Sequence, residues 1–185
     1  MNMTQLDTQE SKAQIERMMY VITQHAEDFL SSQTETVVKK CDYCLENKEF
    51  INLKPLTSFV SLGGNIESII AFSFDENLIA HLTKMFTADI DIEDEEFELY
   101  IRETAGEAVN TIVGHSTAEL APPRHVISLT PPETIYGKKK VLGGEFSKFF
   151  SVTLTTEFGI MDIDFILPKE SFDNKLNFIG QGGTS

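Results

Sequence analysis

The sequence is short of basic residues. Only 15 Lys and Arg stand against 29 Asp and Glu among 185 residues, which gives a formal net charge of −14 at pH 7. The longest basic run covers residues 138–140. Nucleic-acid backbones and anionic membrane surfaces are bound by clusters of Lys and Arg. We therefore expect neither nucleic acid nor a membrane as a partner.

Long apolar runs and cysteines are scarce as well. In the N-terminal fifth the longest apolar run, residues 18–22, is too short for a membrane span or a signal-peptide core. The two cysteines are too few for a disulfide framework. Hydrophobic residues make up 41% and charged residues 24% of the chain, which are ordinary globular values. These features predict a soluble, cytoplasmic protein with one hydrophobic core.

Hydrophobic periodicity outlines a single domain over residues 11–168, between a disordered tail at 1–10 and a polar C-terminal tail at 169–185. It predicts helices near 12–31, 76–87 and 97–120, strands near 57–62, 66–74, 126–129, 149–156 and 160–167, and a lysine-rich loop around 138–140. The order is helix, hairpin, helix, long helix, strand, hairpin. This order predicts an α+β fold of two similar halves, each with helix packed on antiparallel sheet, in two layers.

The predicted helix at 97–120 carries a polar stripe opposite its apolar face. Positions i, i+4, i+7 and i+11 lie on one side of a helix, and here they hold Glu103, Glu107, Asn110 and Gly114. A solvated surface explains most such stripes. Asparagine is nevertheless a poor helix former, so Asn110 calls for a further reason. Seven of the ten residues at 89–98, before the helix, are acidic, which suits its positive N-terminal end.

Glu107 and Asn110 form a Glu-x-x-Asn pair, with Gly114 four residues after the asparagine and Pro132 22 residues after it. The same tetrapeptide at residues 49–52 lacks both additions. The full gapped pattern is expected about 0.002 times by chance in this composition. It resembles the signature of the CheC/CheX/FliY phosphatases of bacterial chemotaxis, and the resemblance covers residues 12–168. Met19 stands where a second asparagine would be expected, which favours the one-site CheX type.

The resemblance implies a CheC-like fold and a phosphatase that hydrolyses the aspartyl phosphate of a CheY-like response-regulator receiver domain. Asn110 would orient the attacking water, and Glu107 would anchor the helix to the receiver's lysine. Glu103, Gly114 and Pro132 would contribute to partner binding, although the family pattern has Asp or Ser where Glu103 stands. No cofactor of its own is implied, because Mg²⁺ would be supplied by the receiver.

The resemblance also implies a homodimer that pairs through its sheets. An alternative function is a non-catalytic adaptor that binds receiver domains, or the flagellar switch, through the same helix.

Two other patterns predict less. Cys41 and Cys44 have the spacing of zinc or thiol redox sites, but no second ligand pair accompanies them and the four histidines are scattered. The alternating acids at 89–93 lack the glycine of a calcium loop. We therefore expect no metal site in this chain.

Overall fold

The computed structural model describes residues 3–63, 67–90, 92–93, 95–121, 127–142, 147–168 and 178–180. Within them the elements are α1 (Met3–Thr34), β1 (Val38–Lys48), β2 (Phe50–Leu53), β3 (Leu56–Gly63), β4 (Ser68–Phe74), α2 (Glu76–Phe86), α3 (Phe97–Leu120), β5 (Ser128–Leu129), β6 (Glu133–Tyr136), β7 (Lys139–Leu142), β8 (Ser147–Thr156), β9 (Ile160–Pro168) and β10 (Phe178–Gly180). No described helix is long and apolar enough to cross a membrane.

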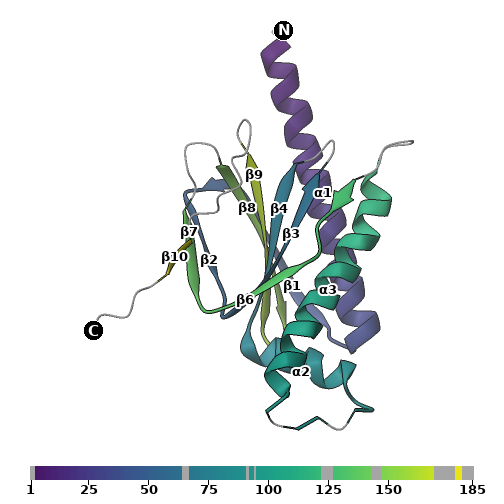
Figure 1. Cartoon of the computed structure of the whole chain (residues 1–185). Helices are drawn as coiled ribbons and strands as arrows, with labels where there is room; N and C mark the ends of the chain where they lie inside the picture. The colour runs from purple at the N-terminus through teal and green to yellow at the C-terminus, as the bar shows by residue number, and fades with distance from the viewer. Residues whose placement is uncertain are drawn as a thin grey trace.

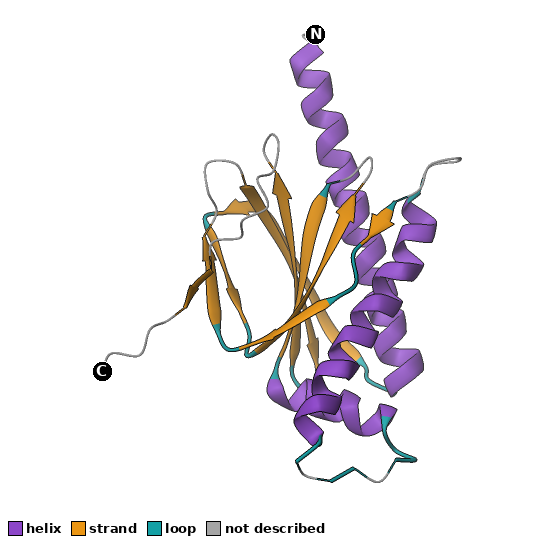
Figure 2. Cartoon of the chain, viewed as in Figure 1, coloured by secondary structure: helices purple, strands orange, loops and turns teal. Residues whose placement is uncertain are grey.

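Seven strands form the main sheet, and every described pairing in it is antiparallel. The order is β1-β8-β9-β4-β3, with β5 and β6 both paired to β3. The helices cover one face of this sheet, and a small sheet in the order β10-β7-β2 lies on the side away from them (Figures 1 and 2). The α+β fold predicted from the sequence is confirmed.

Apart from α2 and the two-residue β5, the two halves of the chain repeat the same order of elements: α1-β1-β2-β3-β4 and α3-β6-β7-β8-β9. Corresponding elements meet in the middle, since α1 packs beside α3, β2 pairs with β7, and β4 pairs with β9. The edge strands are exchanged, because β1 pairs with β8 and β6 pairs with β3. The prediction of two similar halves is confirmed, and each half completes the sheet of the other.

Side chains alternate across the main sheet and create two cores. On the helix side, Phe72 and Phe74 of β4 join Ile22 of α1 and Val109 of α3 in the main hydrophobic cluster. On the other side, a smaller cluster lies between the main sheet and the small one; it contains Ile51, Leu53, Phe59, Ala71, Val141, Phe149 and Ile166. The small sheet therefore adds a partial third layer to the two that were expected.

The first helix begins earlier than the sequence suggested. It starts at Met3, whereas residues 1–10 were expected to form a disordered tail and the helix to begin near residue 12. Residues 3–10 contain neither glycine nor proline. Once a helix has a nucleus, each added residue costs little, so the regular part of α1 extends into this polar segment. Its first turns project beyond the sheet (Figure 1).

Five strands were not predicted: β1, β2, β6, β7 and β10. The polar segment at 38–48 forms β1, and the expected lysine-rich loop contains β7. β1 is the last strand of the main sheet and β7 belongs to the small outer sheet, so both tolerate charged side chains. Within the predicted C-terminal tail, Phe178–Gly180 pairs with β7. The sequence also predicts a turn at the glycine and asparagine of 64–65 and a helix stop at the prolines of 122–123, but these positions and most of the tail lie outside the described residues.

Candidate functional site

Helix α3 is fixed in place by its apolar face. Five of its apolar side chains are at most 1% exposed: Ala105, Ala108, Val109, Ile112 and Val113. They pack in the main core against α1 and the sheet. The predicted polar stripe lies on the opposite face, where Glu103, Glu107 and Asn110 are exposed and Gly114 is half-buried. The helix thus presents these three side chains to any molecule that approaches from outside.

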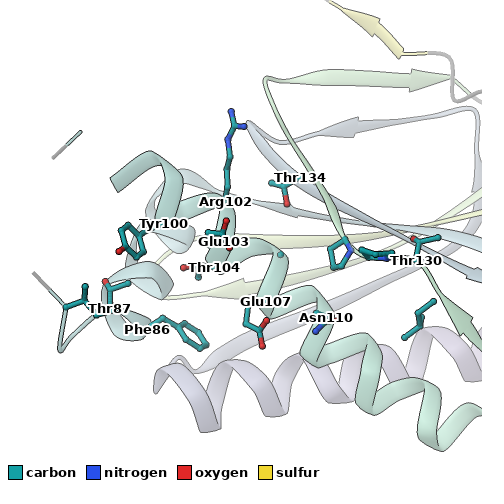
Figure 3. Close-up of a pocket in the computed structure, with 15 residues that line it drawn as sticks. Phe86, Thr87, Tyr100, Arg102, Glu103, Thr104, Glu107, Asn110, Thr130 and Thr134 are labelled. Carbon is teal, nitrogen blue, oxygen red and sulfur yellow. The ribbon is translucent and has the colours of Figure 1, made fainter. Parts of the chain in front are cut away.

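The stripe runs along an open groove of about 920 Å³. One wall is the end of α2 and the following loop, with Phe86 and Ile90, and the other is the segment 129–134, which includes Pro132. Figure 3 shows Glu107 and Asn110 on α3, with Phe86 of α2 lining the same groove. The fold therefore brings together Glu103, Glu107, Asn110 and Pro132. Gly114 lies one helical turn beyond the groove lining.

The reactive groups in the groove have few partners of their own. Among the described residues, none hydrogen-bonds the side-chain amide of Asn110 and none forms an ion pair with Glu103 or Glu107. The Thr111 hydroxyl donates a long bond of 3.4 Å to Glu107 Oε1. Arg102 points away from Glu107, with its guanidinium 4.5 Å from the Tyr136 ring centre and 3.7 Å from Glu98 (Figure 3). One amide and two carboxylates are thus available to a partner.

The wall that contains Pro132 is tied to the sheet on both sides of the proline. Thr130 Oγ1 accepts a 3.0 Å bond from the amide of Ser61, and the Thr130 amide donates to the Ser61 carbonyl at 3.1 Å. The hydroxyls of Thr134 and Ser58 lie 2.6 Å apart. A Cβ on Gly106 would lie 4.0 Å from Thr134 Oγ1, an ordinary contact distance, so Gly106 lies where α3 approaches this wall.

The two cysteines do not form a site. Both are free and lie three residues apart on β1, which turns them to opposite faces of the sheet. Cys41 packs against the main core, whereas Cys44 pairs across the sheet with Ser151. Their separation of about 10 Å along a strand exceeds the roughly 7 Å limit for a disulfide. In the part of the chain that the structure describes, no group of three or more His, Cys, Asp or Glu could hold a metal ion.

The sequence did not indicate the apolar side chains of the groove. Phe86 continues the apolar spacing of buried Leu78 and Leu82 on α2, but it is 39% exposed, and Ile90 and Leu129 are 51% and 37% exposed. Helical periodicity could not separate Phe86 from its buried neighbours, since it lies at the last turn of α2. Only Pro132 was indicated in advance, by its spacing from Asn110.

Known structures share this fold. The chain superposes on the chemotaxis protein CheX of Desulfovibrio desulfuricans with a TM-score of 0.66 and 17% identity, over 81% of this chain and 98% of that one. CheX of Borrelia burgdorferi, determined in complex with CheY, BeF₃ and Mg²⁺, gives 0.63 and 18%, over 80% and 97%. FliY of Thermotoga maritima gives 0.54 and 14%, over 86% and 90%. No curated protein sequence matches the chain.

A family model described as the chemotaxis phosphatase CheX matches residues 56–147. This range contains both walls of the groove, the whole of α3 and all the signature residues from Glu103 to Pro132. The sequence signature, the matched range and the shared fold agree, and the chain belongs to the CheC/CheX/FliY family, within it to the CheX type.

Proposed function

We propose that this protein is a phosphatase that hydrolyses the aspartyl phosphate of a CheY-like receiver domain. The observation that carries the proposal is the placement of the Glu107 and Asn110 side chains on one exposed face of α3 within an open groove, where Glu107 forms no ion pair with any described residue. The description of the matching family and the presence of CheY in the Borrelia complex support a receiver domain as the partner.

The proposed chemistry needs orientation more than a strong base. An aspartyl phosphate is an acyl phosphate that already hydrolyses in water. The water oxygen forms a bond to phosphorus, the bond between phosphorus and the aspartyl oxygen breaks, and the products are the free carboxylate, inorganic phosphate and a proton. The amide of Asn110 offers both a donor and an acceptor to hold that water in line. It contributes no charge that would repel the phosphate.

Glu107 would place Asn110 correctly. It lies three residues before Asn110, close to one helical turn of about 5 Å. Its carboxylate, which has no ion-pair partner among the described residues, would bind the lysine of the receiver through a charge-assisted hydrogen bond. Glu103 would extend this contact by one turn, and Pro132 would meet the receiver from the opposite wall of the groove.

Gly114 offers bare helix backbone to the same partner. A Cβ at this position would meet nothing within 4 Å, so packing inside this chain does not require glycine. A glycine inside a helix costs about 1 kcal/mol relative to alanine. A receiver that approaches the helix backbone closely at Gly114 would explain why glycine occupies this position. The Mg²⁺ that the receiver binds beside its phosphorylated aspartate would come with the partner.

The proposed homodimer would use the free edge of the main sheet. β1 is the terminal strand of the described order, and its outer edge has no described strand against it. Pairing of two such edges would continue the sheet across two copies. A cytoplasmic location follows from the proposed substrate. Light scattering after size exclusion measures the dimer directly, and a monomer at micromolar concentration would contradict it.

The variant Asn110→Ala tests the catalytic proposal. We expect its rate of phosphate release from a phosphorylated CheY-like receiver to fall about 100-fold, because orientation by a single group commonly contributes this much. Binding of the receiver, measured with its BeF₃ complex, should change little. Asn77→Ala is the matched control, since Asn77 is an exposed asparagine on α2 outside the groove. An Asn110→Ala variant as fast as the wild type would refute the catalytic role.

The adaptor remains the second candidate, and the observation in its favour is Glu103 at a position where the family pattern has Asp or Ser. The longer side chain changes the contact at the end of the stripe. A wild-type protein that binds phosphorylated receivers without accelerating their decay would be an adaptor.

A further inference from the structure

The connection between α2 and α3 exposes apolar side chains at the edge of the groove. Phe86 is 39% and Ile90 51% exposed, and both line the same groove as Glu107 and Asn110. Phe86 and Glu107 line the same groove, in which Figure 3 labels both, so a molecule that fills this part of the groove would cover both side chains. Apolar area left in water is unfavourable, and its removal by a partner is a source of affinity.

This wall is fixed before any partner arrives. The Phe86 ring stacks on buried Phe29 with 5.9 Å between centroids. After the helix, the amide of Ile90 donates to the carbonyl of Thr87 at 2.9 Å. The other end of α2 is also held, since the Asp75 carboxylate accepts a 2.8 Å bond from the amide of Ile160 and lies 2.9 Å from Lys54. A preformed wall adds little ordering cost when a partner binds.

Unpaired carboxylates border the apolar side chains. Asp89 and Glu93 are exposed, and among the described residues neither forms an ion pair. Helix stabilisation does not account for them. Asp89 follows the C-terminal end of α2, where the helix dipole disfavours a negative charge, and Glu93 precedes the first residue of α3 by a full turn. Their charges would be compensated by cations on a partner that also covers Ile90.

We propose that Phe86 and Ile90, bordered by Asp89 and Glu93, form a docking wall that selects among receiver domains. It would take a receiver surface on which an apolar side chain beside the phosphorylated aspartate is flanked by Lys or Arg. The inference rests on the proposed function, since it places the receiver over Glu107 and Asn110. The wall contributes to binding and not to the chemical step, because its side chains stand beside the helix that carries Asn110.

Ile90→Ser tests the docking wall. The probes are purified CheY-like receiver domains loaded with BeF₃ and Mg²⁺ for binding, or phosphorylated with acetyl phosphate for turnover. We expect the Kd to rise about fivefold, with turnover at saturating receiver unchanged, since partial burial of one isoleucine has this effect. Leu142→Ser is the matched control, because Leu142 is 41% exposed on β7, away from the groove. It should change neither quantity.

Glu93→Gln tests the charged border. We expect a lower association rate and a weaker dependence of Kd on salt, because a charge at the edge of an interface acts mainly on encounter. For receivers that lack the flanking Lys or Arg, Glu93→Gln and the wild type should associate at the same rate.

Three results would overturn the inference. The first is an unchanged Kd for Ile90→Ser when Asn110→Ala has lost turnover, which would leave the proposed function intact. The second is a loss of turnover by Ile90→Ser at saturation with an unchanged Kd. The third is a change of oligomeric state in Ile90→Ser, which would make the wall a contact between two copies of this chain. A fully active Asn110→Ala would instead contradict the proposed function itself.

Discussion

Helices α1 and α3 occupy equivalent places in the two halves, but their sequences serve different ends. In α1, Met18, Met19 and Ile22 are fully buried, and the helix contains neither glycine nor asparagine. In α3, two glycines and Asn110 lower the helix propensity, and the residues that lower it lie on or beside the exposed stripe. One helix contributes mainly to the core, while the other contributes to both the core and the site.

The burial of α1 accounts for the single Glu-x-x-Asn pair on the two equivalent helices. From the sequence, Met19 stands where a second asparagine would be expected. In the structure Met19 has no exposed surface and packs within the main core. Asparagine at this position would face the sheet and could not reach a partner. We therefore expect no site on the helix of the first half, because the Met19 position packs into the core, and a single substitution there would not supply one.

Met19→Asn should have the largest effect on stability. It removes a buried apolar side chain and buries an amide without a partner, which together cost about 3 kcal/mol or more. Urea unfolding at pH 7 measures this as a lower midpoint. Tyr20→Asn is the matched control. Tyr20 is the next residue on the same helix, its side chain is 57% exposed, and the change should cost little stability. Equal stability of the two variants, or a gain of phosphatase activity by Met19→Asn, would contradict the comparison.

The central strands of the two halves, β4 and β9, differ in whether they bury a charged side chain. Ala71 of β4 faces Asp164 of β9 across the middle of the main sheet. Asp164 is 4% exposed, and its carboxylate accepts a hydrogen bond from Ser151. Burial raises its pKa from 3.8 to about 6, against the lowering effect of the Ser151 bond and with a further raising effect of Asp162.

Asp164→Asn should stabilise the protein at neutral pH. Because the folded pKa is raised, protonated Asp164 adds stability that is fully present below pH 4 and is lost as the pH rises through about 6. At pH 7 the ionised carboxylate costs up to about 3 kcal/mol, at 1.36 kcal/mol for each pKa unit. Asparagine removes this cost and keeps an acceptor for Ser151.

Unfolding free energies from pH 4 to pH 7 test this expectation. The difference between Asp164→Asn and the wild type should be small at pH 4 and grow toward pH 7. Parallel curves for the two proteins over this range would show that Asp164 titrates normally in the folded state.

Gly114→Ala should have the smallest effect on stability, and in the direction opposite to its effect on binding. The added methyl group meets nothing within 4 Å, so the folded state should gain about 1 kcal/mol of helix propensity. Affinity for the receiver should fall, because the methyl group lies where the partner backbone approaches. Thermal unfolding and a binding titration measure the two effects, and a variant that is more stable and binds equally well would remove Gly114 from the interface.

Much of the fold could be predicted because its helices and central strands bury one face. The spacing of Met18, Ile22 and Ala26 located the buried part of α1, and that of Ala105, Ala108 and Ile112 located α3. β1 and β7 could not be found in this way. β1 is a largely exposed edge strand and β7 belongs to the small outer sheet, so both contain charged residues and no alternation of apolar residues marks them.

The site could be predicted along α3 but not across the groove. Glu103, Glu107 and Asn110 share one helix, where spacing alone fixes their common face. Ile90 and Leu129 reach the groove from segments before and after α3, and only the packing of α2 and β5 on the common scaffold brings them there. No local pattern could reveal their proximity.

The central claim is that only the helix of the second half acts on the receiver, and a matched pair of glutamate variants tests it most directly. Glu107 and Glu16 are both exposed and lie on the equivalent helices α3 and α1. The measurement is the rate of phosphate release from a CheY-like receiver phosphorylated with acetyl phosphate. Our account predicts that Glu107→Ala loses most of the acceleration and that Glu16→Ala keeps all of it. Equal rates for the two variants would contradict it.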